Sequence, residues 1–485
     1  MSRIAFLIPD SPDRMGVPAT PHVGIASLAA FVRENGHEPR VIDLRVEPLK
    51  LPELRLRLQE ISPDMVAVTS TSLYYRQVYK AIRVVTEWGW RVVYGGPHVS
   101  LLRESIYNEC QPWAAVYGEG ELPLLHLLEG RDLADIAGVI YRNREGEVVT
   151  NPPPPPVSDL DSLPFAAYEL SSLDRYAERK IPLMTSRGCP CHCTFCAAGL
   201  TMEKRFRPRS PQHVVAEISL WYDRGYRLFG INDDNFTADM ERAGKICDLI
   251  IEKGLDITWE LRTGIRIDRI DEALLTKMHS AGCTFVAFGI EAIDDAVLLA
   301  TAKGIDFGQI DRAVGAAERV GIPFSGFFMI GLPGDTFDKF ERLYRFAASR
   351  RFDEVRFYNV EPYPRTAVYG WVEKHGRWLA SSEEYLNSSS LLDNRPLFET
   401  EEFPLADRLR ATALGEALVV RKLLVKTVGP VLGEGLAFLA WTNWSRKLLF
   451  KAGFRMAPLI RKLHARRASA MRLPCRQGGG APDVR

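Results

Sequence analysis

The chain has 485 residues, of which 46% are hydrophobic and 25% charged, the composition of a globular protein with more than one domain. Its formal net charge of +1 excludes a general nucleic-acid binder, because such proteins carry a domain-wide basic excess. No uncharged apolar run reaches about 18 residues, and the chain opens with a strand-like run instead of a secretory signal. We therefore expect a cytoplasmic protein without a spanning helix.

The first predicted domain covers residues 1–135, where strand-like and helix-like runs alternate. The strand-like runs are 4–8, 40–44, 65–69, 91–94 and 113–117, and the helix-like runs are 24–34, 54–59 and 75–88. This alternation predicts a doubly wound, Rossmann-like parallel sheet of the α/β class. Ligands of such sheets bind beyond the carboxyl ends of the strands. Glycines and hydroxyls gather in the segments that follow the strands, at 9–15, 69–72, 95–98 and 118–121.

A proline-rich segment marks the next boundary. Five successive prolines follow Asn151, so we expect an extended linker within residues 136–175. Residues 176–370 then repeat a strand-then-helix rhythm, with strand-like runs at 181–186, 227–232, 257–263, 285–290, 323–330 and 354–360. Six such units predict a partial (β/α)6 barrel, whose active site lies at the carboxyl ends of the strands.

Three cysteines, Cys189, Cys193 and Cys196, follow the first barrel strand in the spacing Cys-x3-Cys-x2-Cys. A [4Fe–4S] cluster normally takes four thiolates, so three leave one iron open for a substrate or cofactor. Structural zinc is the main alternative, but its fourth ligand would have to be Cys191 or His192 in the same loop. Disulfides are disfavoured in a reducing compartment. The spacing therefore predicts an iron–sulfur site with an open iron.

This cysteine loop resembles the signature of the radical S-adenosylmethionine (SAM) superfamily. The resemblance implies a [4Fe–4S] cluster on Cys189, Cys193 and Cys196, whose open iron chelates SAM. It also implies that an electron donor such as flavodoxin or ferredoxin reduces the cluster, which splits SAM into methionine and a 5′-deoxyadenosyl radical. Phe195 matches the aromatic residue that flanks the adenine. Cys191 stands where relatives carry an apolar or aromatic residue, which leaves its role open.

The same resemblance implies SAM-binding groups at the ends of later barrel strands. Asp233 or Asp234 would meet the ammonium group of SAM by charge-assisted hydrogen bonds. Arg262, at the end of the third strand, would meet a carboxylate, and Glu291, after the fourth, would accept hydrogen bonds from ribose hydroxyls. For each of these residues the alternative is a structural salt bridge or a hydrogen bond at the strand end.

The first domain resembles the cobalamin-binding domain that precedes the catalytic domain in one branch of this superfamily. Ser70, Ser72, Gly95 and Gly96 fall where that fold lines the nucleotide tail and the corrin face. The chain departs from the family in the loop 10–15 after the first strand, which has no histidine to bind cobalt from below. The resemblance therefore implies cobalamin held without such a ligand, and a domain that has lost its cofactor is the alternative.

Together these features predict a cobalamin-dependent radical SAM methyltransferase acting on an unactivated carbon of a small molecule. The substrate classes that we expect are secondary metabolites, lipids and tetrapyrroles. A radical SAM cyclase or ring-rearranging oxidoreductase of the same architecture is the alternative enzyme, and an iron–sulfur or cobalamin redox sensor is the alternative outside enzymes. A methylthiotransferase is disfavoured, because the first domain lacks the three cysteines of a second cluster.

The carboxy-terminal region, residues 371–472, is predicted to be helical, with helices at 406–427, 435–447 and 457–472. Between residues 445 and 472 the charged residues are all basic, and aromatic and aliphatic residues lie beside them. This segment predicts either peripheral contact with an anionic membrane or a basic face docked on the barrel. Residues 473–485 are predicted to be a disordered tail.

Overall fold

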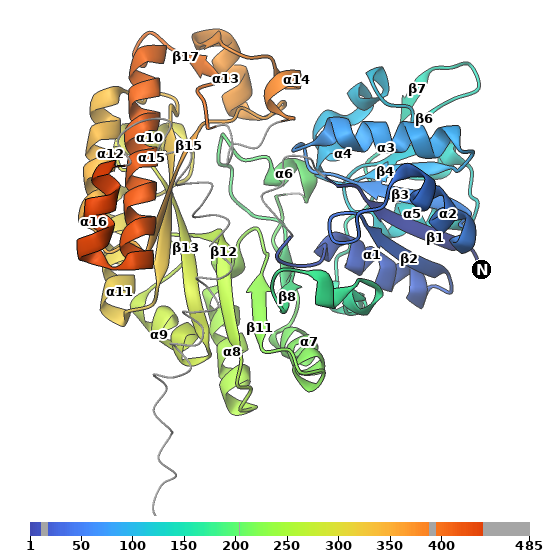
Figure 1. Ribbon diagram of the computed structural model, residues 1–485, viewed down its shortest axis with the longest axis horizontal. Helices are drawn as coiled ribbons and strands as arrows, with labels where there is room; N and C mark the ends of the chain where they lie inside the picture. Colours follow the sequence, from blue (N-terminus) through green and yellow to red (C-terminus); the bar gives the residue numbers. More distant parts are fainter. Residues whose placement is uncertain (11–17, 203, 388–393, 440–485) are drawn as a thin grey trace, which may run out of the picture.

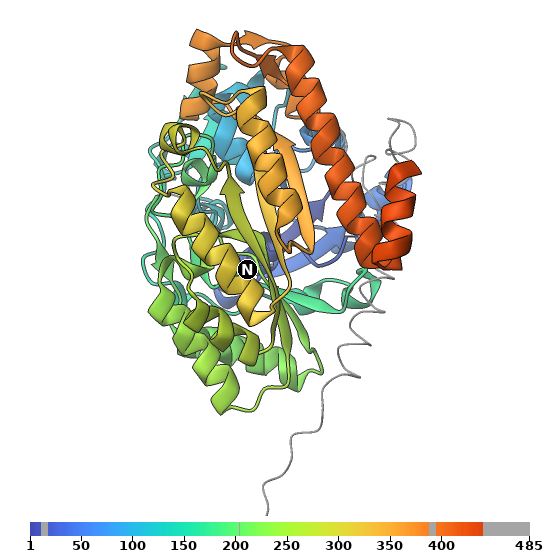
Figure 2. The ribbon, with the colours of Figure 1, turned by 90° about the vertical axis from the view of Figure 1, so that its left-hand side faces the viewer.

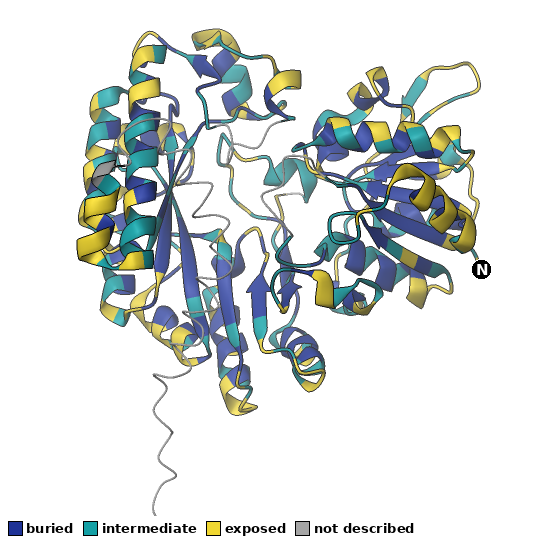
Figure 3. Cartoon of the chain, viewed as in Figure 1, coloured by how far each residue is buried: buried dark blue, intermediate teal, exposed yellow. Residues whose placement is uncertain are grey.

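The computed structural model describes residues 1–10, 18–202, 204–387 and 394–439. Two sheets dominate the architecture, and the short helix α6 (Ala198–Thr201) lies between them (Figure 1). Their strands are buried, while the exposed residues lie mainly on the outer sides of the surrounding helices (Figure 3). The α/β class predicted from the sequence is confirmed for both halves.

The first sheet has the strand order β2-β1-β3-β4-β5-β6-β7. Its strands are β1 (Arg3–Ile8), β2 (Glu38–Asp43), β3 (Met65–Thr69), β4 (Val92–Gly95), β5 (Ala114–Val116), β6 (Val139–Arg142) and β7 (Val148–Thr150). Strands β1 to β5 pair in parallel, as expected for a doubly wound domain. Strands β6 and β7 add an antiparallel edge, so the sheet continues past residue 135, where we had expected the linker to begin.

Helices cover both faces of this sheet. They are α1 (Val23–Glu34), α2 (Leu51–Ile61), α3 (Tyr75–Glu87), α4 (Pro97–Leu102) and α5 (Glu121–Leu128). Apolar residues of α1 and α5 share one core with Phe6, whereas those of α2 and α3 share the other core with Leu7. Alternate residues of β1 thus point to opposite faces, which explains why its run of hydrophobic residues is continuous.

The proline segment is extended, as predicted, but it packs against the first domain. Pro154 contacts Gly118 and Gly138, and a Cβ at Gly138 would lie 2.9 Å from the proline ring. The Gly138 N–H also donates to the Pro152 carbonyl at 2.7 Å. The proline segment is therefore held in place along the edge of the first domain.

The second sheet holds six parallel strands in the order β15-β14-β13-β12-β11-β8, which is the sequential order of a partial barrel. The strands are β8 (Lys180–Leu183), β11 (Leu228–Ile231), β12 (Thr258–Arg266), β13 (Cys283–Glu291), β14 (Phe324–Ile330) and β15 (Glu354–Asn359). The helices are α7 (Pro211–Asp223), α8 (Met240–Glu252), α9 (Glu272–Ser280), α10 (Asp295–Ala300), α11 (Phe307–Val320) and α12 (Phe337–Ser349), and Figure 2 looks onto those that cover the outer face. Side chains accept first-turn N–H groups at the starts of all six of these helices: Ser210, Asp239, Asp271, Asp294, Asp306 and Thr336.

The carboxy-terminal region begins with α13 (Ala367–His375), α14 (Ser382–Tyr385) and a short hairpin of β16 (Arg377–Trp378) and β17 (Phe398–Glu399). The helix predicted at 406–427 is α15 (Leu405–Val428), which packs against β15 and α12. Helix α16 (Pro430–Leu439) includes the first residues of the helix predicted at 435–447. The remainder of that helix, the helix at 457–472, the basic segment and the tail lie outside the described residues. Among the described residues, no helix is long and apolar enough to cross a membrane.

Candidate functional site

The predicted cluster loop leaves the barrel at the carboxyl end of its first strand. After β8, the two-residue strand β9 (Ser186–Arg187) pairs with β10 (Arg207–Pro208), and Gly188 then turns the chain at a φ of 77°. A left-handed φ favours glycine, because a Cβ would clash with the backbone. Thr194 anchors the loop, since its N–H donates to the Thr301 carbonyl at 2.9 Å and its carbonyl accepts from Val368 N–H at 3.0 Å.

Each of the three predicted ligand thiols accepts a hydrogen bond. Asn235 Nδ2 donates to Cys189 Sγ at 3.9 Å, and Arg266 Nη1 donates to Cys193 Sγ at 3.9 Å. The Ala198 N–H donates to Cys196 Sγ at 3.4 Å. Such donors stabilise thiolates and tune the potential of an iron–sulfur cluster. The donor set therefore fits a cluster held by three thiolates.

In the described part of the chain, no group of three or more His, Cys, Asp or Glu residues is arranged to hold a metal ion. The thiolates of a four-iron cluster spread around a cube of iron and sulfur, so they stand farther apart than the ligands of one ion. Cys189 and Cys193 lie close enough to Cys196 for their charges to raise its pKa, after burial, to about 11. The three thiols therefore lie near one another in the loop, and the cluster they are predicted to hold stays a prediction.

Cys191 takes a different part from the other thiols of the loop. It donates a hydrogen bond to Cys189, and this bond is the main cause that lowers the pKa of Cys189 to about 6. The same bond raises the pKa of Cys191. The choice of Cys189, Cys193 and Cys196 as ligands, with Cys191 as a hydrogen-bonding neighbour of Cys189, stays a prediction.

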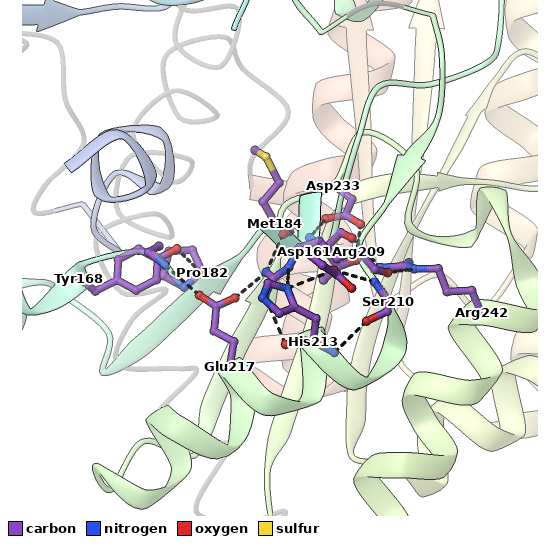
Figure 4. A network of polar contacts seen from close by, with 12 residues as sticks. Asp161, Tyr168, Pro182, Met184, Arg209, Ser210, His213, Glu217, Asp233 and Arg242 are labelled. Carbon is purple, nitrogen blue, oxygen red and sulfur yellow. Dashed lines mark hydrogen bonds and ion pairs between the residues drawn. The ribbon is translucent and has the colours of Figure 1, made fainter. Parts of the chain in front are cut away.

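The two aspartates that follow β11 have different surroundings in the structure. Asp233 is buried, and its oxygens accept from Thr185 N–H at 2.6 Å, Thr185 Oγ1 at 2.5 Å and Ser186 Oγ at 2.6 Å. It belongs to the polar network that ties the β8 end to Arg242 (Figure 4). Asp234 is exposed and accepts from Gly188 N–H at 3.2 Å. Of the two, only Asp234 keeps oxygens available to the ammonium group of SAM.

Arg266 contacts the cluster loop, and Arg262, on the same strand, has other partners. Arg262 binds Glu260 at 2.7 Å and lies 3.6 Å from Glu354, and its predicted role toward a carboxylate of SAM stays a prediction. Strand β12 runs three residues farther than expected, to Arg266, which donates to Cys193 and to the Lys303 carbonyl at 2.6 Å. A longer strand assignment would have found this residue in the sequence.

Glu291 ends β13 with a φ of 65°, a left-handed conformation that non-glycine residues adopt at a cost of about 1 kcal/mol or more. Its Oε1 accepts from the buried Lys303 Nζ at 2.9 Å, and the same Nζ donates to the Gly289 carbonyl at 2.5 Å. Lys303 lies close enough to Cys193 for its charge to lower the pKa of that thiol, against the raising effect of burial. Glu291 thus faces the loop, and its predicted role toward ribose stays open. Phe195 is half-buried and packs against the core beside the cysteines.

We predict that Asn235→Leu makes the cluster potential more negative by tens of millivolts, because the Cys189 thiolate loses a hydrogen-bond donor. Iron content is expected to stay unchanged, since Asn235 is not a ligand. Spectroelectrochemistry of the reconstituted protein measures the shift, with Asn232→Leu at an exposed neighbouring position as the control. Equal potentials in all three proteins would contradict this role for Asn235.

The residues predicted to bind cobalamin lie together at the carboxyl edge of the first sheet. Ser70 Oγ hydrogen bonds with Tyr94 Oη at 2.6 Å, and Ser72 Oγ with His98 Nδ1 at 3.1 Å, so both buried hydroxyls have partners within the domain. Gly96 has a φ of 102°, and a Cβ there would lie 2.5 Å from Thr69 Oγ1. Gly95 is half-buried beside it.

His98 shares this edge, is fully buried and stacks on Tyr75 with ring centroids 4.5 Å apart. Burial lowers its pKa to about 3, so it stays neutral. Ser70, Ser72 and His98 are thus bonded within the domain, whereas Gly95 and Gly96 are half-buried and have no side chains. Glycine lets a ligand approach the backbone closely, and the assignment of these residues to cobalamin stays a prediction.

The glutamates of segment 118–121 join the two domains. Glu119 and Glu121 are buried, and they pair with two arginines of the barrel that flank the cluster loop. Arg187 Nη2 lies 2.6 Å from Glu121, and Arg207 donates to Glu119 Oε2 at 3.0 Å. This segment, predicted to lie at the ligand edge, also forms a junction between the domains, because the partners of both glutamates come from the barrel.

A second contact between the domains is made by the segment that follows the last barrel strand. Arg365, which follows β15, donates to the carbonyls of Ser100 at 2.9 Å and Leu101 at 3.3 Å in α4. Helix α4 also contacts α6 beside the cysteines. Loops from the carboxyl ends of both sheets therefore meet around the cluster loop.

Comparisons with known proteins identify a family for each of the two domains. The model of the Radical SAM superfamily matches residues 183–347, and that of the B12 binding domain matches residues 18–128. An uncharacterized methyltransferase of Pyrococcus horikoshii is 34% identical over 360 residues, 72% of this chain and 78% of that protein. Cytidylyl-2-hydroxyethylphosphonate methyltransferase of Streptomyces wedmorensis is 26% identical over 70% of this chain and 75% of its own length.

Solved structures share the fold. The radical SAM methyltransferase TsrM of Kitasatospora setae, with cobalamin and a [4Fe–4S] cluster bound, superposes with a TM-score of 0.72 at 18% identity, covering 96% of this chain and 100% of that one. The cobalamin-dependent radical enzyme OxsB reaches 0.67 at 15% identity, covering 97% of this chain and 81% of that one. The radical SAM domain implies a [4Fe–4S] cluster and SAM as cofactors, and the B12 domain implies cobalamin. The chain is therefore an enzyme of the radical SAM superfamily, in the branch that joins a B12 binding domain to the radical SAM domain.

Proposed function

We propose that this enzyme is a cobalamin-dependent methyltransferase that methylates an unactivated carbon of a small molecule, of the secondary-metabolite, lipid or tetrapyrrole type. The observation that carries the proposal is the meeting of carboxyl-edge loops from both sheets around Cys189–Cys196. Two cofactors bound at those edges would face one shared space. The methyltransferases of Pyrococcus horikoshii and Streptomyces wedmorensis support the reaction class.

The chain's own residues hold and orient the reactants. When bound, the cluster with SAM supplies a carbon radical that abstracts hydrogen, and cobalamin supplies the methyl group. Cys189, Cys193 and Cys196 would hold the cluster, and Asp234 would accept from the ammonium group of SAM. The buried ion pairs of the junction close one side of the site against water. A small electron carrier such as flavodoxin or ferredoxin would reduce the cluster.

A second candidate is a cyclase of the same architecture. Anaerobic magnesium-protoporphyrin IX monomethyl ester cyclase of Rubrivivax gelatinosus is 26% identical over 72% of this chain and 66% of its own length. Such an enzyme would form deoxyadenosine without a methylated product. The sensor interpretation does not hold, because the chain belongs to a family of enzymes. A cytoplasmic location and membrane contact through residues 445–472 stay predictions.

The test is anaerobic reconstitution with iron, sulfide and hydroxocobalamin, followed by desalting. We expect about one cobalamin retained per chain by its visible spectrum, and transfer of label from methyl-labelled SAM to cobalamin. Retention near zero with an intact cluster would mean that the first domain has lost its cofactor and would overturn the methyltransferase proposal. Retention with deoxyadenosine formation but no labelled product in candidate acceptors would favour the cyclase.

A further inference from the structure

Glu361 is a half-buried glutamate at the barrel mouth, and the site described above gives it no role. Glu361 follows β15, the last barrel strand, at its carboxyl end. Its Oε1 is enclosed and has no hydrogen-bond partner among the described residues, which also place no Lys or Arg in an ion pair with it. The Tyr363 hydroxyl interacts with the carboxyl. Proteins seldom leave a buried carboxyl oxygen unpaired, because desolvation without a partner is unfavourable.

Glu354, the first residue of β15, is a half-buried carboxylate that is paired with cations, as is usual for such a group. Lys426 Nζ lies 2.9 Å from its carboxylate and Arg262 lies 3.6 Å away. Burial raises the pKa of Glu354, but these cations hold it at about 2. Burial raises the pKa of Glu361 to about 7, and no cation offsets the effect. Glu354 is thus paired with cations of the protein, whereas Glu361 has only the Tyr363 hydroxyl beside it and its Oε1 accepts no hydrogen bond among the described residues.

The surroundings indicate what that partner is. Tyr363 is half-buried and lies close enough to Cys196 for their charges to interact, so Glu361 stands beside the cluster loop. The Tyr385 hydroxyl donates to the carbonyl of Pro362, the residue after Glu361, at 2.6 Å. A carboxylate oxygen that accepts no hydrogen bond suits a nitrogen group that carries hydrogens and positive charge.

We propose that Glu361 binds an amino group of a small molecule held at the mouth of the barrel. Two sources have this chemistry, SAM and the methyl acceptor. The inference rests on the proposed function for the identity of the acceptor. Its test reads folding and binding, so a failure of methyl transfer or of cobalamin retention would leave these measurements interpretable.

The first measurement is the melting temperature of the reconstituted protein. A group with a raised folded pKa favours folding below its unfolded pKa of 4.5, and that contribution is lost as the pH rises through about 7. Glu361→Gln is therefore expected to raise the melting temperature at pH 8 by roughly 2 °C, and by less at pH 5. Glu354→Gln is the matched control and is expected to lower it, because two cations lose their partner.

The second measurement is SAM binding to the same variants by equilibrium dialysis. Stabilisation with a roughly tenfold rise in the SAM dissociation constant would place the amino group on SAM. Stabilisation with unchanged SAM binding would place it on the methyl acceptor. A loss of stability in Glu361→Gln at pH 8, comparable to that of Glu354→Gln, would mean that Glu361 has a partner within the protein and would overturn the proposal.

Discussion

Replacing Cys193 with alanine is expected to abolish the cleavage of SAM. A cluster held by three thiolates in one loop loses a third of its protein ligands, and Cys193 is also the thiol on which Arg266 converges. Iron and sulfide content should fall sharply after anaerobic reconstitution, and formation of 5′-deoxyadenosine should drop to background. Both are measured directly, by iron assay and by chromatography of the reaction. Full cleavage of SAM by this variant would disprove the cluster assignment.

The matched control lies in the same loop. Cys191→Ala removes a thiol that donates to Cys189 but is not a predicted ligand. We expect iron content close to that of the unmodified protein, with a modest change in the spectrum because the Cys189 thiolate loses its donor. An equal loss of iron in Cys191→Ala and Cys193→Ala would show that the ligand set was chosen wrongly.

Replacing Arg207 with methionine is expected to destabilise the domain junction by about 3–5 kcal/mol. Arg207 is buried and pairs with Glu119, which is buried too. Burial favours the neutral form of Glu119. Hydrogen bonds from Arg207 and the positive charge of Arg187 nevertheless hold its pKa below the ordinary 4.5. Without Arg207 a buried carboxylate loses its main partner. Denaturant unfolding followed by fluorescence should show the loss, together with weaker cobalamin retention.

The double variant Glu119→Gln/Arg207→Met tests the cause. Removing both charges should restore part of the lost stability, because no unpaired charge stays buried. A folded pKa below 4.5 also means that the pair stabilises the junction above that pH and weakens as the pH falls below it. Equal stability of Arg207→Met and the unmodified protein would refute an energetic role for this pair.

The sequence alone determined the features that depend on local order along the chain. Strand and helix periodicity places all six barrel strands within a few residues, and the helix at 406–427 is found as α15 (Leu405–Val428). The spacing of Cys189, Cys193 and Cys196 predicts an open iron–sulfur site, because one loop of eight residues holds every expected ligand. These features can be predicted without knowing which residues far apart in the sequence come into contact.

Tertiary structure decided which polar residues are free for chemistry. Asp233 and Asp234 are neighbours in sequence, but only packing shows that Thr185 and Ser186 occupy the first and leave the second open. The partners of Glu119 and Glu121 lie 88 and 66 residues away, so no local pattern distinguishes a ligand edge from a domain junction. A side chain's role depends on the charges and donors that folding brings to it, and those come from remote parts of the chain.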